Sequence, residues 1–258
     1  MVAGYLGSLG VALGMATRLQ VGKVLLGAFL VPWSNREAFA RALAIPLLSI
    51  VAVNLSWYYA RDYLPSFSNW LLYFVYCGLY VIFAVTCHRL VLLDTRSVAA
   101  RPHWSWRETK FLAWVIVIGL IFAVALPVLA TPMTNILMWT GLGVHDDRFQ
   151  WSIQCGQILA LYIVSRLFLV FPATAIDRRV NFKWAWRRSK NNGWRLVIIV
   201  GALPWVLSNL VWLLYRENEG ILEDIVITFL GSAIVAFEVA ALSLSYRELT
   251  KEDAMDRG

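Results

Sequence analysis

The sequence predicts an all-α membrane protein with six transmembrane helices, arranged as three helical-hairpin repeats with amphipathic elbow helices on the cytoplasmic side. Apolar residues make up 60% of the 258 residues, and the mean hydropathy is +0.64. Soluble domains contain roughly 45–50% apolar residues. Six apolar segments each hold the roughly 20 residues that a helix needs to cross a bilayer. Basic residues and tryptophans gather at the ends of these segments.

The six apolar segments define the predicted spans. We place them at about residues 38–60, 70–93, 111–130, 151–175, 194–215 and 225–246. Helices are the expected spanning form, because a membrane barrel would need short segments of alternating polarity instead. Pro204 falls inside the fifth span, where neighbouring helices can accommodate a kink. Pro172 is expected to bend the fourth span close to its cytoplasmic end.

The distribution of basic residues predicts the orientation of the spans. Of the 23 Lys and Arg residues, 20 fall on one side of the implied membrane, and only Arg61, Arg148 and Arg216 fall on the other. Because cytoplasmic connections carry the excess of basic residues, both termini are expected to be cytoplasmic. The net charge of +7 is therefore attributed to membrane topology, and no nucleic acid partner is expected. A basic surface that also binds anionic lipid headgroups is the alternative.

The chain divides into a leader, a bundle and a tail. The predicted parts are an N-terminal interfacial leader at 1–32, a six-span bundle at 33–250 with repeats at about 33–96, 101–179 and 181–250, and a cytoplasmic tail at 251–258. The leader is apolar and rich in glycine. It has no basic residue ahead of its apolar run, so a signal peptide is not expected.

Short motifs of tryptophan and basic residues precede the odd-numbered spans. Trp104–Lys110 aligns with Trp184–Lys190 at two tryptophans, one arginine and one lysine, and Trp33–Glu37 resembles both. Tryptophan prefers the headgroup region and basic side chains reach lipid phosphates, so each motif predicts a short helix on the cytoplasmic leaflet. An aromatic belt without a helix is the alternative. The expected headgroup contacts are Trp104, Trp106, Arg107, Lys110, Trp184, Trp186, Arg187, Arg188 and Lys190.

Glu238 is the acidic residue that the sequence places in the middle of a span. A charge at that depth costs a few kcal/mol unless it is paired or protonated. Arg166 in the fourth span is the favoured partner, and Arg89 lies nearer the inner surface. A structural ion pair, a protonated glutamic acid, and a relay for protons or substrate all remain open.

Polar residues at helical spacing predict a polar face inside the bundle. Gln154, Gln157 and Ser165 share one side of the fourth span, and Ser245 shares one side of the sixth span with Glu238. Polar residues of transmembrane helices seek partners on neighbouring helices, so both sides are expected to point into the bundle. They either pack against other helices or line a polar cavity.

The sequence contains no motif of a known catalytic or metal centre. A nucleophile elbow, a phosphate-binding glycine loop, HExxH and CxxC are all absent. The run His145-Asp146-Asp147 supplies too few ligands for a metal site in one loop. We therefore expect a protein that is not an enzyme, with no catalytic residues, no metal site and no cofactor.

Three segments resemble a known family. Arg166–Ala173, Ala185–Arg195 and Ser245–Thr250 resemble poorly characterised six-span bacterial inner-membrane proteins. A similar module forms the membrane domain of some glycerophosphodiester phosphodiesterases, and the resemblance covers most of residues 30–250. It implies a six-span fold in the bacterial inner membrane. It implies no catalytic residues, because the hydrolytic barrel of those phosphodiesterases is a separate domain that nothing here encodes.

Together these observations predict a non-enzymatic inner-membrane protein. We expect a scaffold or accessory subunit that contacts anionic lipid on the cytoplasmic side and a protein partner in a membrane complex. The alternative is a small transporter or lipid-handling protein with a polar path through the bundle. An intramembrane enzyme is a third class, and the sequence offers no recognisable nucleophile and base for it.

Overall fold

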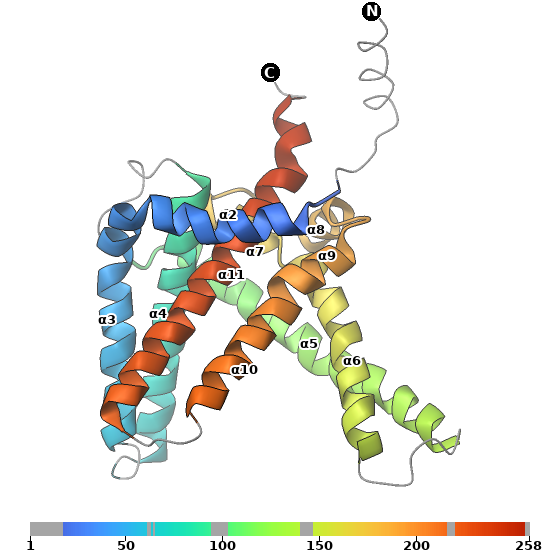
Figure 1. The fold of residues 1–258 in the computed structure, drawn as a ribbon, viewed down its shortest axis with the longest axis horizontal. Helices are drawn as coiled ribbons and strands as arrows, with labels where there is room; N and C mark the ends of the chain where they lie inside the picture. The colour runs from blue at the N-terminus through green and yellow to red at the C-terminus, as the bar shows by residue number, and fades with distance from the viewer. Residues whose placement is uncertain are drawn as a thin grey trace, which may run out of the picture.

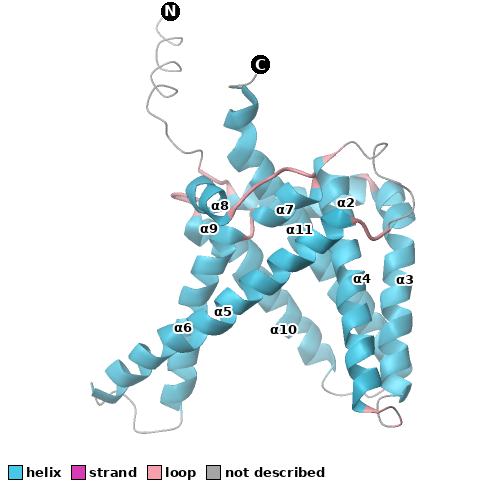
Figure 2. Cartoon of the chain, turned by 180° about the vertical axis from the view of Figure 1, so that it is seen from behind, coloured by secondary structure: helices cyan, strands magenta, loops and turns pink. Residues whose placement is uncertain are grey.

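The computed structural model describes residues 18–60, 63, 65–93, 103–139, 147–215 and 220–255. This part of the chain is built of helices and contains no strand (Figures 1 and 2), which confirms the all-α fold class. Six helices are long and apolar enough to cross a membrane, as expected of a multi-pass membrane protein. Their membrane segments are Arg36–Ala60, Phe67–Leu92, Trp106–Ile136, Ile153–Ala175, Gly193–Val211 and Ile221–Lys251.

The long helices run alternately up and down, so their ends fall at two opposite ends of the bundle (Figure 1). The elements are α2 (Val21–Ser34), α3 (Arg36–Ala60), α4 (Ser66–Leu92), α5 (Trp106–Trp139), α6 (Asp147–Leu167), α7 (Val170–Ala175), α8 (Phe182–Arg188), α9 (Gly193–Val197), the π-helical turn η2 (Ile198–Ala202), α10 (Leu203–Tyr215) and α11 (Ile221–Met255).

Helix α2 lies across one end of the bundle, crosswise to α3 and α4 (Figure 1). It packs directly on α11, because a Cβ added at Gly27 would lie 2.9 Å from Leu244 Cδ1. Just before α2, the Leu19 amide donates to Asn192 Oδ1 at 2.9 Å. The described part of the predicted leader is therefore a helix docked on the bundle. Residues 1–17 of the leader and 256–258 of the tail lie outside the described residues.

Helix α11 is the centre of one group of helices, because it contacts α2, α3, α4 and α10. Polar side chains connect it to two of these neighbours. Asn54 Nδ2 on α3 donates to Thr228 Oγ1 at 2.9 Å. On α4, the buried His88 Nδ1 lies 2.7 Å from Ser243 Oγ. Buried polar groups need such partners, so these hydrogen bonds fix how the helices align.

Helices α5 and α6 form a second, tightly packed pair. A Cβ at Gly156 would lie 2.9 Å from the backbone N and Cα of Ala130, so glycine allows the two backbones to approach closely. The pair slopes away from the other long helices toward the end opposite α2 (Figures 1 and 2). It contacts the rest of the chain through α4, α7, α8, α9 and η2.

Two prolines account for irregularities in the spans. The fourth span is interrupted at Phe168 and Leu169, between α6 and α7. The ring of Pro172 clashes with the carbonyl four residues earlier in an unbroken helix, so the predicted bend in this span is confirmed. In the fifth span, η2 ends two residues before Pro204, and its wider turn accommodates the proline ring.

The three aligned tryptophan motifs occupy different local structures. Trp33 lies in the last turn of α2, Trp104 precedes α5, and Trp184 lies inside α8. Only α2 and α8 are described helices that precede a span. Residues 94–102, which join the first two predicted repeats, lie outside the described residues. The organisation into three repeats with elbow helices therefore stays a prediction.

Candidate functional site

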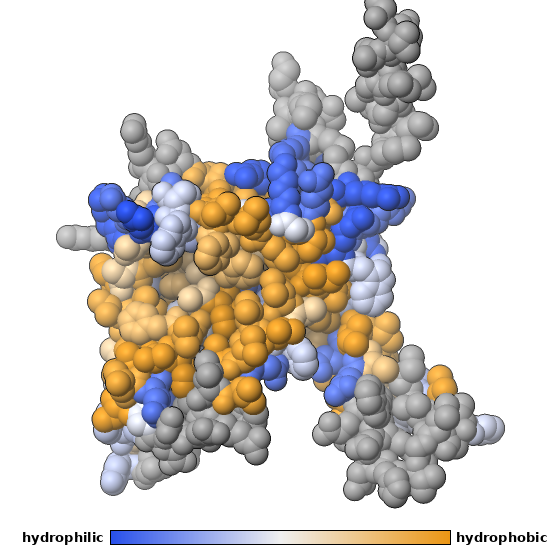
Figure 3. Space-filling model, in the orientation of Figure 1, coloured by the Kyte–Doolittle hydropathy of each residue, from blue (hydrophilic) through white to orange (hydrophobic). Residues whose placement is uncertain are grey.

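Basic side chains gather at the end of the bundle where α2 lies, which we call the basic end. Those described there are Arg18, Lys23, Arg36, Arg41, Arg89, Arg107, Lys110, Arg166, Arg178, Arg179, Lys183, Arg187, Arg188, Lys190, Arg195, Arg247 and Lys251. Among the described side chains of the opposite end, none is basic. Figure 3 shows hydrophilic residues gathered at the basic end and broad hydrophobic surface beyond it.

Arg166 fixes α8 to the end of α6. Its Nε donates to Ser189 Oγ at 3.0 Å, and its Nη2 donates to the Trp186 carbonyl oxygen at 2.7 Å. The guanidinium carbon also lies 3.6 Å from the centre of the Trp186 ring, which is a close cation–π contact. Asn181 caps the start of α8 by accepting from the Trp184 amide at 2.9 Å. Helix α8 is therefore held at both of its ends.

Most of the predicted headgroup residues are exposed at the basic end. The exposed ones at this end are Trp106, Lys110, Trp186, Arg187 and Lys190, while Arg188 is half-buried. Lys110 Nζ lies 5.8 Å from the Trp106 ring centre, and Trp106 is 69% exposed. An exposed tryptophan beside an exposed basic side chain is the composition expected where a protein surface meets lipid headgroups.

Arg107 and Arg89 instead make contacts within the protein. Arg107 Nε lies 3.4 Å from Asp177 Oδ1, and Arg89 Nη1 lies 3.7 Å from Asp177 Oδ2. Arg89 also donates to the Ala175 carbonyl oxygen at 3.2 Å. Asp177 therefore connects α4, α5 and the segment after α7. Asp177 was not among the predicted site residues, although an acidic residue within a basic connection was a signal that could have identified it.

Two of the predicted headgroup tryptophans lie against other helices. The Trp184 ring is half-buried, with its centre 6.0 Å from that of Tyr246 on α11 and 5.6 Å from Arg178 Cζ. The Trp104 ring lies 3.6 Å from a Cβ added at Gly78. Gly78 is 14 residues from the end of α4, about 21 Å along the helix axis. Trp104 is thus deeper than the predicted headgroup position.

The predicted ion pair between Glu238 and Arg166 is not formed. Glu238 is half-buried on α11 and makes no hydrogen bond or ion pair with the residues that the structure describes. Arg166 bonds instead to Ser189 and Trp186, and Arg89 pairs with Asp177. A protonated Glu238 and a relay at Glu238 remain predictions.

The predicted polar face has two parts with different surroundings. Ser165 and Ser245 are fully buried, and each hydroxyl donates to a backbone carbonyl of its own helix, at 3.1 and 2.8 Å. Gln154 and Gln157 are exposed. The expectation that this face points into the bundle is therefore wrong for the two glutamines, because the helices separate where these residues lie.

The glutamines lie on the side of α6 that points toward α10. Leu161 belongs to the same side and contacts Gly201 in η2 so closely that no Cβ fits there. Beyond this contact α6 and α10 separate (Figure 1), which leaves Gln154 and Gln157 without a neighbouring helix. Asn209 on α10 is also exposed. Exposed amides inside the predicted membrane segments are costly in hydrocarbon, so these residues are candidates for contact with another molecule.

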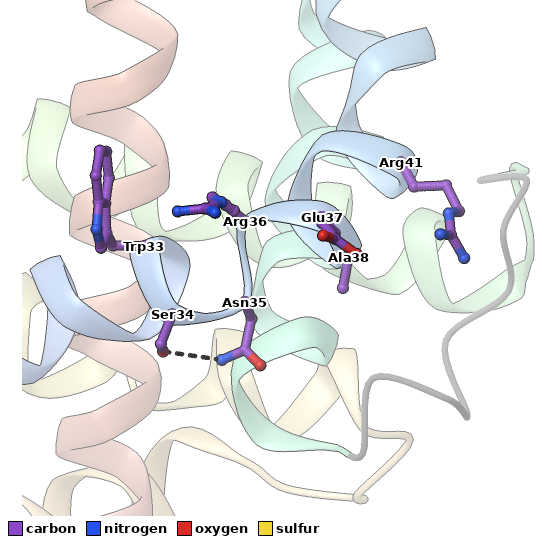
Figure 4. A pocket seen from close by; sticks show the side chains of 7 residues that line it. All are labelled: Trp33, Ser34, Asn35, Arg36, Glu37, Ala38 and Arg41. Carbon is purple, nitrogen blue, oxygen red and sulfur yellow. Dashed lines mark hydrogen bonds between the residues drawn. The ribbon is translucent and has the colours of Figure 1, made fainter.

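A pocket of about 650 Å³ lies at the corner between α2 and α3. Figure 4 shows its lining residues, with Arg36 directed toward Trp33 and Arg41 directed to the other side of α3. Asn35 Nδ2 donates to Ser34 Oγ at 3.3 Å within it. The two arginines diverge, so the pocket does not bring them together around one ligand.

The described residues contain no group of three or more His, Cys, Asp and Glu side chains that could hold a metal ion. Comparison of the chain with protein-family models, curated proteins and solved structures gave no match in any of the three. The resemblance to the membrane domain of glycerophosphodiester phosphodiesterases therefore stays a prediction.

Proposed function

We propose that the protein is a non-enzymatic scaffold of the bacterial inner membrane, which binds anionic lipid at its cytoplasmic face and a protein partner within the membrane. The observation that carries the proposal is the basic end, where exposed basic side chains and tryptophans surround the ends of the spans. Because basic residues remain on the cytoplasmic side, this end is proposed to face the cytoplasm, with both termini there.

The exposed side chains of α8 and the first turns of α5 are the proposed lipid contacts. Trp106 and Trp186 are suited to the headgroup region, and Lys110, Arg187 and Lys190 are suited to its phosphates. Each basic residue near an anionic surface contributes on the order of 1 kcal/mol. A rigid α8, held by Arg166, would keep its basic side chains at one depth and reduce the entropy lost on binding.

Lipid selectivity in nanodiscs tests the proposed lipid binding. Spin-labelled phosphatidylglycerol and phosphatidylcholine would be compared for immobilisation by the full-length protein. We expect a preference for phosphatidylglycerol that weakens with salt and falls in the variant Arg187→Gln/Lys190→Gln. The matched control Arg187→Lys retains the charge and should retain the preference. Equal immobilisation of the two lipids by the unmodified protein would refute lipid selectivity.

The partner is proposed to contribute a transmembrane helix that packs on the half of α5 and α6 that lies away from the basic end. Only 6% of the apolar window of α5 is buried, against 33% in α3 and in α4. Gln154 and Gln157 are exposed on the neighbouring helix α6, and a partner helix with small or polar residues could pair with their amides.

Photo-crosslinking tests the proposed partner. A photo-crosslinking residue at Ile158 should give one discrete adduct, which should be lost in the variant Gln154→Leu/Gln157→Leu. Leu48, which is also exposed on α3, is the control position. Adducts of the same kind from both positions would contradict the proposal.

The same two glutamines favour the second candidate, a transporter or lipid-handling protein with a polar path. Water between α6 and α10 would distinguish it from a scaffold. Three variants, each with a single cysteine, would be exposed to a charged thiol reagent: Gln157→Cys, Ala241→Cys and, as the control, one that keeps only the native Cys155 on another side of α6. Reaction at both introduced cysteines favours a path through the bundle, and protection of both favours the scaffold.

A further inference from the structure

A cleft of about 460 Å³ lies between α2 and the last turns of α11, at the basic end. Three basic side chains, Arg18, Lys23 and Arg247, line it together with the amide of Gln20. All three are exposed, and none makes a hydrogen bond or ion pair with another residue of the described part of the chain. Basic side chains that share a cleft and form no ion pair with an acidic side chain favour an anionic ligand.

One carboxylate also lines the cleft. Glu248 Oε1 accepts a hydrogen bond from Lys251 Nζ at 2.7 Å, and these two residues form an ion pair. The charge of Glu248 is therefore largely offset by a residue that does not line the cleft. The three remaining basic side chains leave a positive charge for a ligand to neutralise.

The floor of the cleft is apolar. Val24, Gly27 and Val31 contribute from α2, and Leu244 contributes from α11. Val24 and Leu244 are buried, and Gly27 lies directly against Leu244. Basic side chains beside an apolar floor are suited to an amphiphile with an anionic head and an alkyl portion, more than to a free inorganic ion.

The position of α2 places this cleft where lipid headgroups would be. Leu26, Phe29 and Leu30 are exposed on α2, while α2 lies across the basic end of the bundle (Figure 1). A helix in this position with exposed apolar side chains lies in the membrane interface. The cleft beside it would open toward the headgroup layer, where phosphate diesters are the abundant anions.

We infer that the cleft between α2 and α11 binds one phosphate-bearing lipid, with the phosphate among Arg18, Lys23 and Arg247 and the first alkyl carbons on Gly27 and Leu244. Guanidinium groups bind phosphate oxygens in pairs, and the lysine ammonium adds a point charge. The inference rests on the proposed contact of the basic end with anionic lipid. It adds a discrete site of one lipid, formed by residues outside the predicted headgroup set.

Native mass spectrometry of the full-length protein in detergent tests this site by counting retained lipids. Phosphatidylglycerol would be titrated, with phosphatidylcholine as the neutral lipid. We expect one tightly retained phosphatidylglycerol, whose affinity falls roughly 30-fold in Lys23→Gln/Arg247→Gln, the loss expected for two basic contacts to an anionic lipid. The matched control Arg36→Gln/Arg41→Gln removes the same charge from the pocket between α2 and α3, where the two arginines point apart, and should retain the tight lipid. Equal effects of the two double variants would overturn the site.

The apolar floor is tested at Val31, which is half-buried and lines the cleft, because a larger side chain at Gly27 would push α2 away from Leu244. In Val31→Phe the larger side chain would occupy the floor without changing the charge, so the tight lipid should be lost, while inorganic phosphate and glycerol 3-phosphate fail to compete for the site in the unmodified protein. Retention of the lipid by Val31→Phe, or displacement of the lipid by either small phosphate, would overturn a lipid site. Unchanged melting temperature and elution volume would show that each variant is folded.

The elbow variant Arg187→Gln/Lys190→Gln separates this inference from the proposed function. It should lower the preference for spin-labelled phosphatidylglycerol in nanodiscs and leave the single tight lipid in place. If the preference falls in that variant but no lipid depends on Lys23 and Arg247, the discrete site is refuted and the proposed function stands. If neither preference nor tight lipid is found, both are refuted.

Discussion

The helices around α11 and the α5–α6 pair differ in how they are held together. Helix α11 bonds to its neighbours through side chains, including His88 with Ser243 at 2.7 Å. The α5–α6 pair instead relies on the close approach of Gly156 to the Ala130 backbone. Lipid offers little hydrophobic driving force between helices, so hydrogen bonds and close packing are the two available means. The comparison shows that one chain uses both means.

Replacing Gly156 should have the largest effect. In Gly156→Leu the new side chain overlaps the backbone of Ala130, which cannot move aside as a flexible side chain could. We expect a loss of roughly 1–3 kcal/mol or more of stability, measured as thermal unfolding in detergent. Gly119→Leu is the matched control on α5, because a Cβ there meets nothing within 4 Å. Equal stability of the two variants would break the comparison.

Removing the contact between His88 and Ser243 should have the next largest effect. Both side chains are buried. The Ser243 hydroxyl donates to the Val239 carbonyl oxygen at 2.8 Å, a bond that His88→Leu leaves in place and Ser243→Ala removes. A double-mutant cycle of His88→Leu and Ser243→Ala should give a coupling energy of about 1 kcal/mol, as for other polar contacts between transmembrane helices. Additive effects on unfolding would show that the two residues do not act together.

Asn54 provides a weaker test of the same group of helices. Asn54→Leu removes the half-buried bond to Thr228 and should cost about 0.6 kcal/mol. Asn209→Leu is the matched control, because among the described residues the Asn209 amide bonds to none but Trp205, whose carbonyl oxygen on the same helix lies at 2.7 Å. Chemical unfolding of both variants checks this prediction, and a larger loss from Asn209→Leu would contradict it.

The effect expected at Glu238 has the opposite direction. Because no described residue pairs with its carboxylate, Glu238→Gln removes a group whose charged form is costly inside a membrane, and it should raise stability. Arg166→Gln should lower stability, since it loses the bonds to Ser189 and Trp186. Melting temperatures of the two variants check both signs. A loss of stability in Glu238→Gln would indicate a partner for this residue.

Length and composition were sufficient to predict the six spans, because crossing a bilayer requires a long apolar helix whatever its neighbours are. The break before Pro172 was predictable for a similar reason, since its cause is local. Helix α2 was harder to anticipate, because glycine disfavours isolated helices. Gly27 is tolerated there since its small size allows α2 to pack on Leu244.

Side-chain partners at the site could not be predicted to the same extent. Arg166 was paired with Glu238 on the basis of depth alone, while Trp186 and Ser189, 20 and 23 residues further along the chain, supply two acceptors. Arg107 was expected to contact lipid, and Asp177 contacts it instead. These outcomes depend on the rotation and crossing of helices, which periodicity within one helix does not specify.

The order of synthesis gives the central position of α11 a consequence for biogenesis. Helices α3 and α4 enter the bilayer well before α11 is translated, so Asn54 and His88 wait there without the partners that α11 later supplies. During that interval the early spans depend on the insertion machinery or on each other. A chain cut short before Thr228 would leave those polar groups in hydrocarbon and would be a ready substrate for membrane proteases.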